Sequence, residues 1–66
     1  MEPQTHHERA IAQAVDERFR QDPTVAYTSI VPDVAASLAF LMSASDSKFL
    51  VRYSQWRSDH PETPGP

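Results

Sequence analysis

The stretch THHERAIAQAVDERFRQ, residues 5–21, decides the fold class of this chain. Within it, Ile11, Val15 and Phe19 follow one another at intervals of four, the spacing of side chains that share one face of an α-helix. An apolar stripe of this kind is stabilised only when another surface removes it from water. The stretch therefore predicts an amphipathic helix that lies against a hydrophobic core.

Signals for the start, the end and the exposed side of this helix accompany the stripe. Thr5 and Glu8 have the pattern of a capping box, in which each side chain bonds to the backbone amide of the other residue. Pro23 ends the helix, because the residue before a proline avoids the helical region. Asp16 and Arg20, one turn apart with the acid first, predict an ion pair on the solvated side.

The middle of the chain predicts a second main helix after an ambiguous segment. Residues 23–30 are rich in β-branched and aromatic side chains, so an extended segment and a short helix or turn both fit. We favour the helix or turn, because a lone strand would have no partner. Pro32 has the position of a first helical residue, which predicts a helix over residues 32–44. Its core-facing side chains would be Val34, Leu38 and Leu41.

A third main helix is predicted over residues 47–58. Read alone, residues 48–53 also fit a strand, but Trp56 continues the i, i+4, i+7 spacing of Phe49 and Tyr53 and favours a helix. Residues near its start that are acceptable at the N-cap are Ser45, Asp46 and Ser47.

Together these elements predict a small all-α bundle of three main helices. Residues 1–58 form a single helical domain, and residues 59–66, which are rich in proline, form a disordered C-terminal tail. A chain of 66 residues buries only about 60% of the surface that its unfolded form exposes. It contains no cysteine, so no disulfide can stabilise it, and we expect self-association or a partner protein to do so.

The predicted second helix is apolar nearly all round, more than so short a chain can cover by itself. We therefore expect a non-catalytic protein–protein interaction module, which forms a homo-oligomer or docks on a partner protein. The partner-binding residues would be those that fall off the core stripes and stay exposed in a monomer: Phe40, Met42, Leu50 and Val51.

The charge distribution leaves one alternative function open. The net charge of −3 opposes general binding to nucleic acid, which needs a basic surface. Residues 48–57, however, carry Lys48, Arg52 and Arg57 without an acid. We expect these cations to pair with acids of the first helix, and the alternative is a small DNA-binding transcriptional regulator.

Catalytic, metal and cofactor sites are not predicted. His6 and His7 are adjacent and diverge on a helix, so they do not chelate a metal together. The chain has one glycine, Gly65, so the glycine-rich loops that bind nucleotides are missing. No site for a small-molecule substrate is evident, and no apolar run reaches the roughly 18–20 residues of a membrane span. We expect a cytoplasmic protein.

The segment PDVAASLAFLMSASDSKFL, Pro32–Leu50, resembles the C-terminal helix and loop of short-chain dehydrogenases/reductases. In that family a helix that begins with Pro-acid-Val-Ala ends in Phe-Leu, and a serine-rich loop and an apolar strand follow. The family's Tyr-x-x-x-Lys motif is absent, because Arg57 stands where the lysine after Tyr53 would be. The resemblance therefore implies no catalytic or cofactor-binding residue here.

Overall fold

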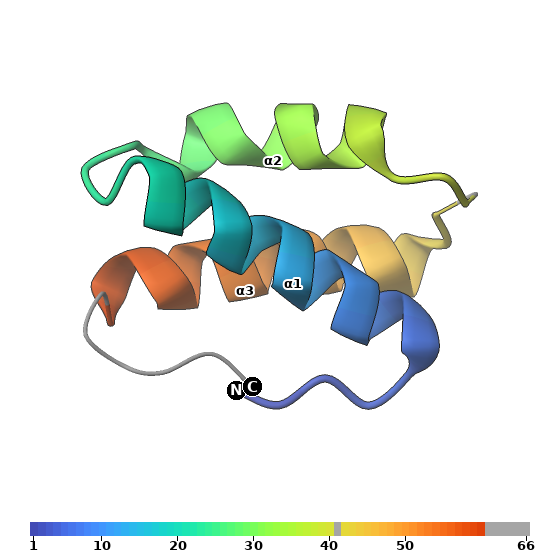
Figure 1. The fold of residues 1–66 in the computed structure, drawn as a ribbon. Coiled ribbons are helices and arrows are strands. Elements are labelled where there is room, and N and C mark those ends of the chain that lie inside the picture. Colours follow the sequence, from blue (N-terminus) through green and yellow to red (C-terminus); the bar gives the residue numbers. More distant parts are fainter. Residues whose placement is uncertain (41, 61–66) are drawn as a thin grey trace.

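The protein is a bundle of three α-helices in a computed structural model that describes residues 1–40 and 42–60. The helices are α1 (His6–Gln21), α2 (Tyr27–Ser37) and α3 (Ala44–Asp59). The chain runs along α1, returns along α2 and then follows α3 in the first direction, with α2 lying across one side of the α1–α3 pair (Figure 1). The predicted all-α bundle is confirmed.

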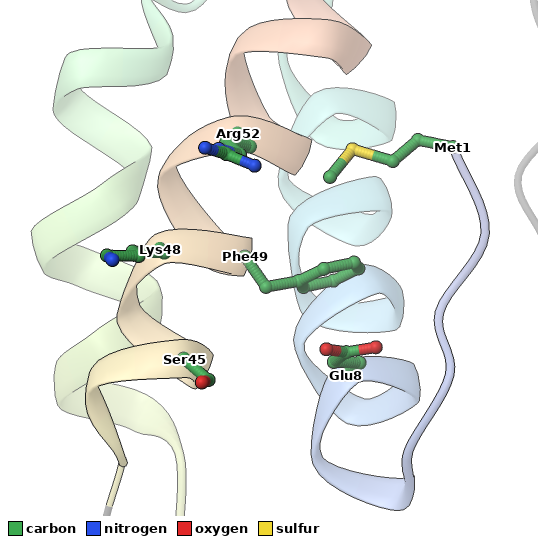
Figure 2. Close-up of a pocket in the computed structure, with 6 residues that line it drawn as sticks. All are labelled: Met1, Glu8, Ser45, Lys48, Phe49 and Arg52. Carbon is green, nitrogen blue, oxygen red and sulfur yellow. The ribbon is translucent and has the colours of Figure 1, made fainter.

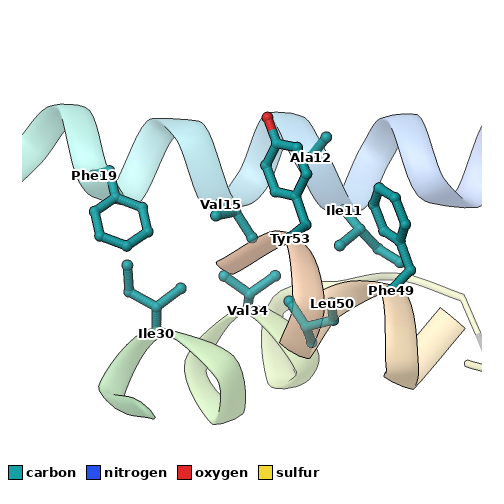
Figure 3. Packing of buried hydrophobic residues seen from close by; sticks show 9 residues of the cluster. All are labelled: Ile11, Ala12, Val15, Phe19, Ile30, Val34, Phe49, Leu50 and Tyr53. Atoms are coloured by element: carbon teal, nitrogen blue, oxygen red, sulfur yellow. The ribbon is translucent and has the colours of Figure 1, made fainter. Parts of the chain in front are cut away.

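The core lies between the three helices and takes residues from each of them. Figure 3 shows Phe19 of α1 facing Ile30 of α2, and Leu50 of α3 beside Val34 of α2. The predicted stripes of α1 and α3 are thus part of the core, although Trp56 is only partly buried. The buried apolar residues are Ile11, Ala12, Val15, Phe19, Ile30, Val34, Phe49, Leu50 and Tyr53.

One of the two hydrogen bonds of the predicted capping box is present at the start of α1. The Thr5 hydroxyl accepts a hydrogen bond from the Glu8 amide at 3.1 Å, as a capping residue does. The Glu8 carboxylate accepts from the Gln4 amide rather than from Thr5. The first helix therefore begins and ends where its sequence predicts.

The prediction that the second helix starts at Pro32 is wrong, because Pro32 lies inside α2. Ile30 and Val34 are one turn apart and both buried, so the apolar stripe of this helix spans the proline. The Pro32 ring is exposed, and its missing amide removes one bond to the Thr28 carbonyl. Burial of the stripe outweighs that loss.

The prediction that this helix continues to residue 44 is also wrong, since α2 ends at Ser37. Leu38 has an extended backbone, and the chain bends at the next two residues, where Ala39 is exposed. Non-helical chain therefore brings part of the apolar run onto the core, so α2 has no further apolar turn to cover. The packed side chains are Leu38, Phe40 and Met42; the predicted core residue Leu41 lies outside the described residues.

The third helix is longer at both ends than predicted. Ser43, rather than a later residue, is its N-cap: its hydroxyl accepts from the Asp46 amide, and the Asp46 carboxylate accepts from the Ser43 amide, each at 3.1 Å. The helix continues to Asp59, the first residue of the predicted tail, and residues 61–66 of that tail lie outside the described part. Within residues 1–40 and 42–60, no helix has the length and hydropathy needed to cross a membrane.

Candidate functional site

A buried polar triad joins α1 to α3 behind the apolar core. The Tyr53 hydroxyl donates to the Asp16 carboxylate at 2.9 Å, and Arg57 Nε lies 2.9 Å from the same Asp16 oxygen. The Arg57 guanidinium also donates to the Tyr53 oxygen at 3.1 Å. The predicted Asp16–Arg20 pair is therefore wrong: Asp16 faces α3, and Arg20 pairs with Glu17.

This triad is largely enclosed by the bundle. The side chains of Arg57 and Asp16 are only 6% and 14% exposed, so their bonds act between the helices rather than at the surface. Burial raises the pKa of Tyr53 to about 12, and the Asp16 carboxylate adds to the rise while Arg57 opposes it. A phenol with that pKa stays protonated at neutral pH, which does not suit a general base.

A second polar cluster ties the start of α1 to the start of α3. His7 Nδ1 lies 3.1 Å from an Asp46 carboxylate oxygen, and the His7 ring stacks on Phe40 with 3.9 Å between ring centroids. The bond from the Ser43 amide and then that from His7 hold the pKa of Asp46 below its ordinary value of 3.8.

Among the described residues, this cluster contains two groups of the kind found in a catalytic triad. A carboxylate beside the Nδ1 of a histidine is the arrangement that orients a general base. In the described part of the chain, however, no hydroxyl bonds to His7, and Asp46 is already engaged as the cap of α3. Nor do these residues contain a group of three or more His, Asp or Glu side chains that could hold a metal ion.

The outward face of α3 carries two cations side by side, Lys48 and Arg52, which we call the cationic ridge. They are one helical turn apart, so they are neighbours on the surface. Both are exposed, and neither forms an ion pair with any residue that the structure describes. The prediction that this basic segment pairs with acids of the first helix is therefore confirmed for Arg57 and wrong for the ridge.

Two open hollows flank the ridge and share its side chains. The Phe49 hollow, of about 240 Å³, is lined by the ridge and by Met1, Glu8, Ser45 and Phe49. Figure 2 shows the Phe49 ring projecting from α3 toward α1 and the segment that carries Met1. The Val51 hollow, of about 320 Å³, is lined by the ridge together with Ser47 and Val51. Both hollows lie at the low end of, or below, the roughly 300–1,000 Å³ that small-molecule pockets usually enclose, and both are open at the surface.

The four predicted partner-binding residues have different surroundings. Leu50 is 2% exposed, so the prediction that it stays exposed in a monomer is wrong: α2 covers the side of α3 on which it lies. Val51 is 43% exposed, as predicted. Phe40 and Met42 are partly buried against the core, and Phe40 is further covered by His7. Whether any of the four binds a partner stays a prediction.

Sequence reasoning missed both polar clusters and the ridge as a unit. The i, i+4 spacing of Tyr53 and Arg57 was a signal that one polar edge of α3 faces a neighbour, but nothing in the sequence identified Asp16 as that neighbour. Lys48 and Arg52 have the same spacing. Whether they form ion pairs with acids of α1 depends on how α1 packs on α3, which the sequence does not show.

Comparisons with known proteins add no relative. No family model matches the chain, and neither curated proteins nor solved structures give a match. Nothing in these comparisons bears on the resemblance of Pro32–Leu50 to short-chain dehydrogenases/reductases, which supplies no residue to the surfaces described above.

Proposed function

We propose that this protein is a non-catalytic interaction module that docks on a partner protein through α3. The docking face consists of the cationic ridge and the Phe49 and Val51 hollows. The observation that carries the proposal is the exposure of Val51, at 43%, beside two cations that pair with no acid among the described residues. Exposed apolar surface rimmed by polar groups is a feature of interaction sites, and arginine is enriched in them.

Docking on a different protein is better supported than obligate self-association. The chain has an accessible surface of 4391 Å², close to the roughly 4,200 Å² expected for a compact monomer of its mass. The sequence predicts that Leu50 stays exposed on α3 in a monomer, but in the structure it is in the core. A folded monomer therefore needs no second copy to complete its core, and we keep the expected cytoplasmic location with this proposal.

DNA binding remains the alternative, because the ridge also suits phosphate groups. Two cations neutralise about two phosphates, whereas DNA-binding proteins commonly contact about six to ten. The net charge of −3 opposes the approach of a duplex, which carries far more negative charge than a short acidic segment. Retention on duplex DNA at low salt that is lost in K48E/R52E would favour this alternative over protein docking.

Site-specific photo-crosslinking in the source cells tests the proposal. A photoreactive amino acid at position 51 lies on the docking face, and the same group at Gln13 lies on the exposed side of α1. We expect one discrete adduct with another protein from position 51, its loss in K48E/R52E, and no such adduct from position 13. Equal labelling from both positions, or adducts of this chain with itself alone, would contradict the proposal.

A further inference from the structure

We infer that the partner of the docking face is an acidic protein segment with two carboxylates one helical turn apart and bulky apolar side chains beside them. This inference rests on the proposed function and specifies the chemistry of the partner. Its basis is the order of groups across α3: a hollow of mixed polarity that contains Phe49 and Met1, the cationic ridge, and the mainly apolar Val51 hollow.

The order of these groups follows from the helical spacing. At about 100° per residue, Ser45 and Phe49 lie on one side of the ridge. Ser47 and Val51 lie on the other side. Lys48 and Arg52 are i and i+4, so their side chains can contact acids with the same spacing on another helix. The guanidinium of Arg52 can bind a carboxylate through two parallel hydrogen bonds, which fixes orientation as well as charge.

The two hollows are the reason why we assign bulky apolar side chains to the partner. Phe49 and Met1 make one of them apolar at the base, and Val51 does so for the other. Of the residues that line the two hollows, Glu8 is the one acid, and its carboxylate already accepts from the Gln4 amide. The Val51 hollow therefore takes an apolar side chain, the Phe49 hollow takes one against Phe49 and Met1, and the ridge between them takes the acids.

A second copy of this chain is a poorer occupant, because none of its three helices carries two acids at i and i+4, and three of its helix acids already pair with arginines. Glu17 pairs with Arg20, Asp33 with Arg18 and Asp16 with Arg57. Docking on another copy would have to break such pairs to free two carboxylates for the ridge. An acidic segment of another protein has no such competition.

Peptide binding measured by fluorescence anisotropy tests the inference with the full chain. The probe is a labelled helical peptide with two glutamates at i and i+4 and leucines on either side of them. One matched peptide has lysines for the glutamates, and another has alanines for the leucines. We expect the acidic peptide to bind about tenfold more tightly than the lysine peptide at low salt, and more tightly than the alanine peptide.

Protein variants identify the surface that binds. K48E/R52E should lose about tenfold in affinity for the acidic peptide and gain affinity for the lysine peptide. R9E is the matched control, because Arg9 is an exposed arginine of α1, and it should change the affinity by less than about twofold. K48A/R52A removes the charge without reversal, and circular dichroism verifies that each variant folds.

Three outcomes would overturn the inference. They are equal binding of the acidic and lysine peptides, an undiminished affinity in K48E/R52E, and a loss in R9E as large as that in K48E/R52E. Should crosslinking from position 51 succeed while the acidic peptide fails to bind, the docking proposal stands and only the acidic partner is rejected. Failure of both experiments rejects the docking face itself.

Discussion

Tyr53 is both a core residue and a hydrogen-bonding residue, and its place in an apolar stripe predicts only the first role. Its spacing from Phe49 predicts a core position, and the ring is fully buried. Its hydroxyl also donates to Asp16 and accepts from Arg57, which the spacing does not reveal. Apolar periodicity predicts which side of a helix is buried, but a polar partner from another helix depends on how the two helices cross.

Burial of Tyr53 predicts an alkaline limit to stability. Its pKa is about 12 when folded, against an ordinary value of 10.0, so the folded chain retains a proton that the unfolded chain loses. Stability from this group is complete below pH 10 and is lost as the pH rises from 10 toward 12. Ultraviolet absorbance should show a phenolate transition near pH 12 that is missing in Y53F. A Tyr53 transition near pH 10 in the folded protein would contradict this.

Ser54 differs from Tyr53, because its buried hydroxyl has no hydrogen-bond partner among the described residues. Replacing it with alanine removes an uncompensated desolvation cost and improves helix propensity. We expect S54A to increase the free energy of unfolding by up to about 1 kcal/mol in urea denaturation. S47A, at an exposed position of the same helix, measures the propensity part alone. A loss of stability in S54A would show that the hydroxyl has a partner.

Among the elements, α2 is where sequence reasoning failed most. Pro32 was interpreted as a helix start because proline suits the first turn, but the buried Ile30–Val34 pair places it in the interior. The apolar run after Ser37 leaves the helix and packs against the core through Leu38, Phe40 and Met42, which a helical interpretation cannot detect. The first helix, with its clear stripe and cap, was predicted within a residue at each end.

The interior proline predicts that α2 is less stable than it could be. P32A restores an amide that can donate to the Thr28 carbonyl, and the exposed ring leaves no cavity. We expect the free energy of unfolding to rise by about 1–2 kcal/mol, less than the full helical cost of proline because alanine also loosens the unfolded chain. P23A, in the turn after α1, should give no gain. If P32A destabilises, the proline contributes contacts beyond its backbone.

The cap of α3 predicts sensitivity to acid. The pKa of Asp46 is lowered below 3.8 in the folded chain, so the unfolded chain binds the proton first as the pH falls. The contribution of Asp46 is therefore present above its unfolded pKa and is lost as the pH falls through its folded pKa. Unfolding midpoints measured from neutral to acidic pH should fall for the natural chain with a slope that D46N reduces. An unchanged slope in D46N would assign the acid sensitivity to other carboxylates.

The complete bundle alters the grounds on which the sequence predicts self-association, which itself stays a prediction. The second helix, expected to be apolar nearly all round, ends at Ser37, and α2 packs on α3 and buries Leu50. Of the candidate docking residues, Val51 remains exposed. The ridge beside it could be recognised only from the structure, because the structure shows which acids of α1 pair with α3. The fold class followed from local patterns, but the candidate site followed from the arrangement of helices.

A self-contained core predicts a monomer in solution. Sedimentation equilibrium at micromolar concentration should give a mass near 7.4 kDa, and the melting temperature should not depend on concentration. V51D should leave both unchanged, because position 51 is exposed. A dimer that V51D dissociates would show that the docking face binds a second copy.

Amide chemical shifts test most directly whether α3 is the docking helix. The ¹⁵N-labelled chain, titrated with the acidic peptide, reports each backbone amide in one measurement. We predict that the largest shift changes lie between Ser45 and Arg52, with small changes in α2 and on the exposed side of α1. Changes centred on α2 or on the Phe40–His7 stack, or no saturable change at all, would contradict docking through the outward face of α3.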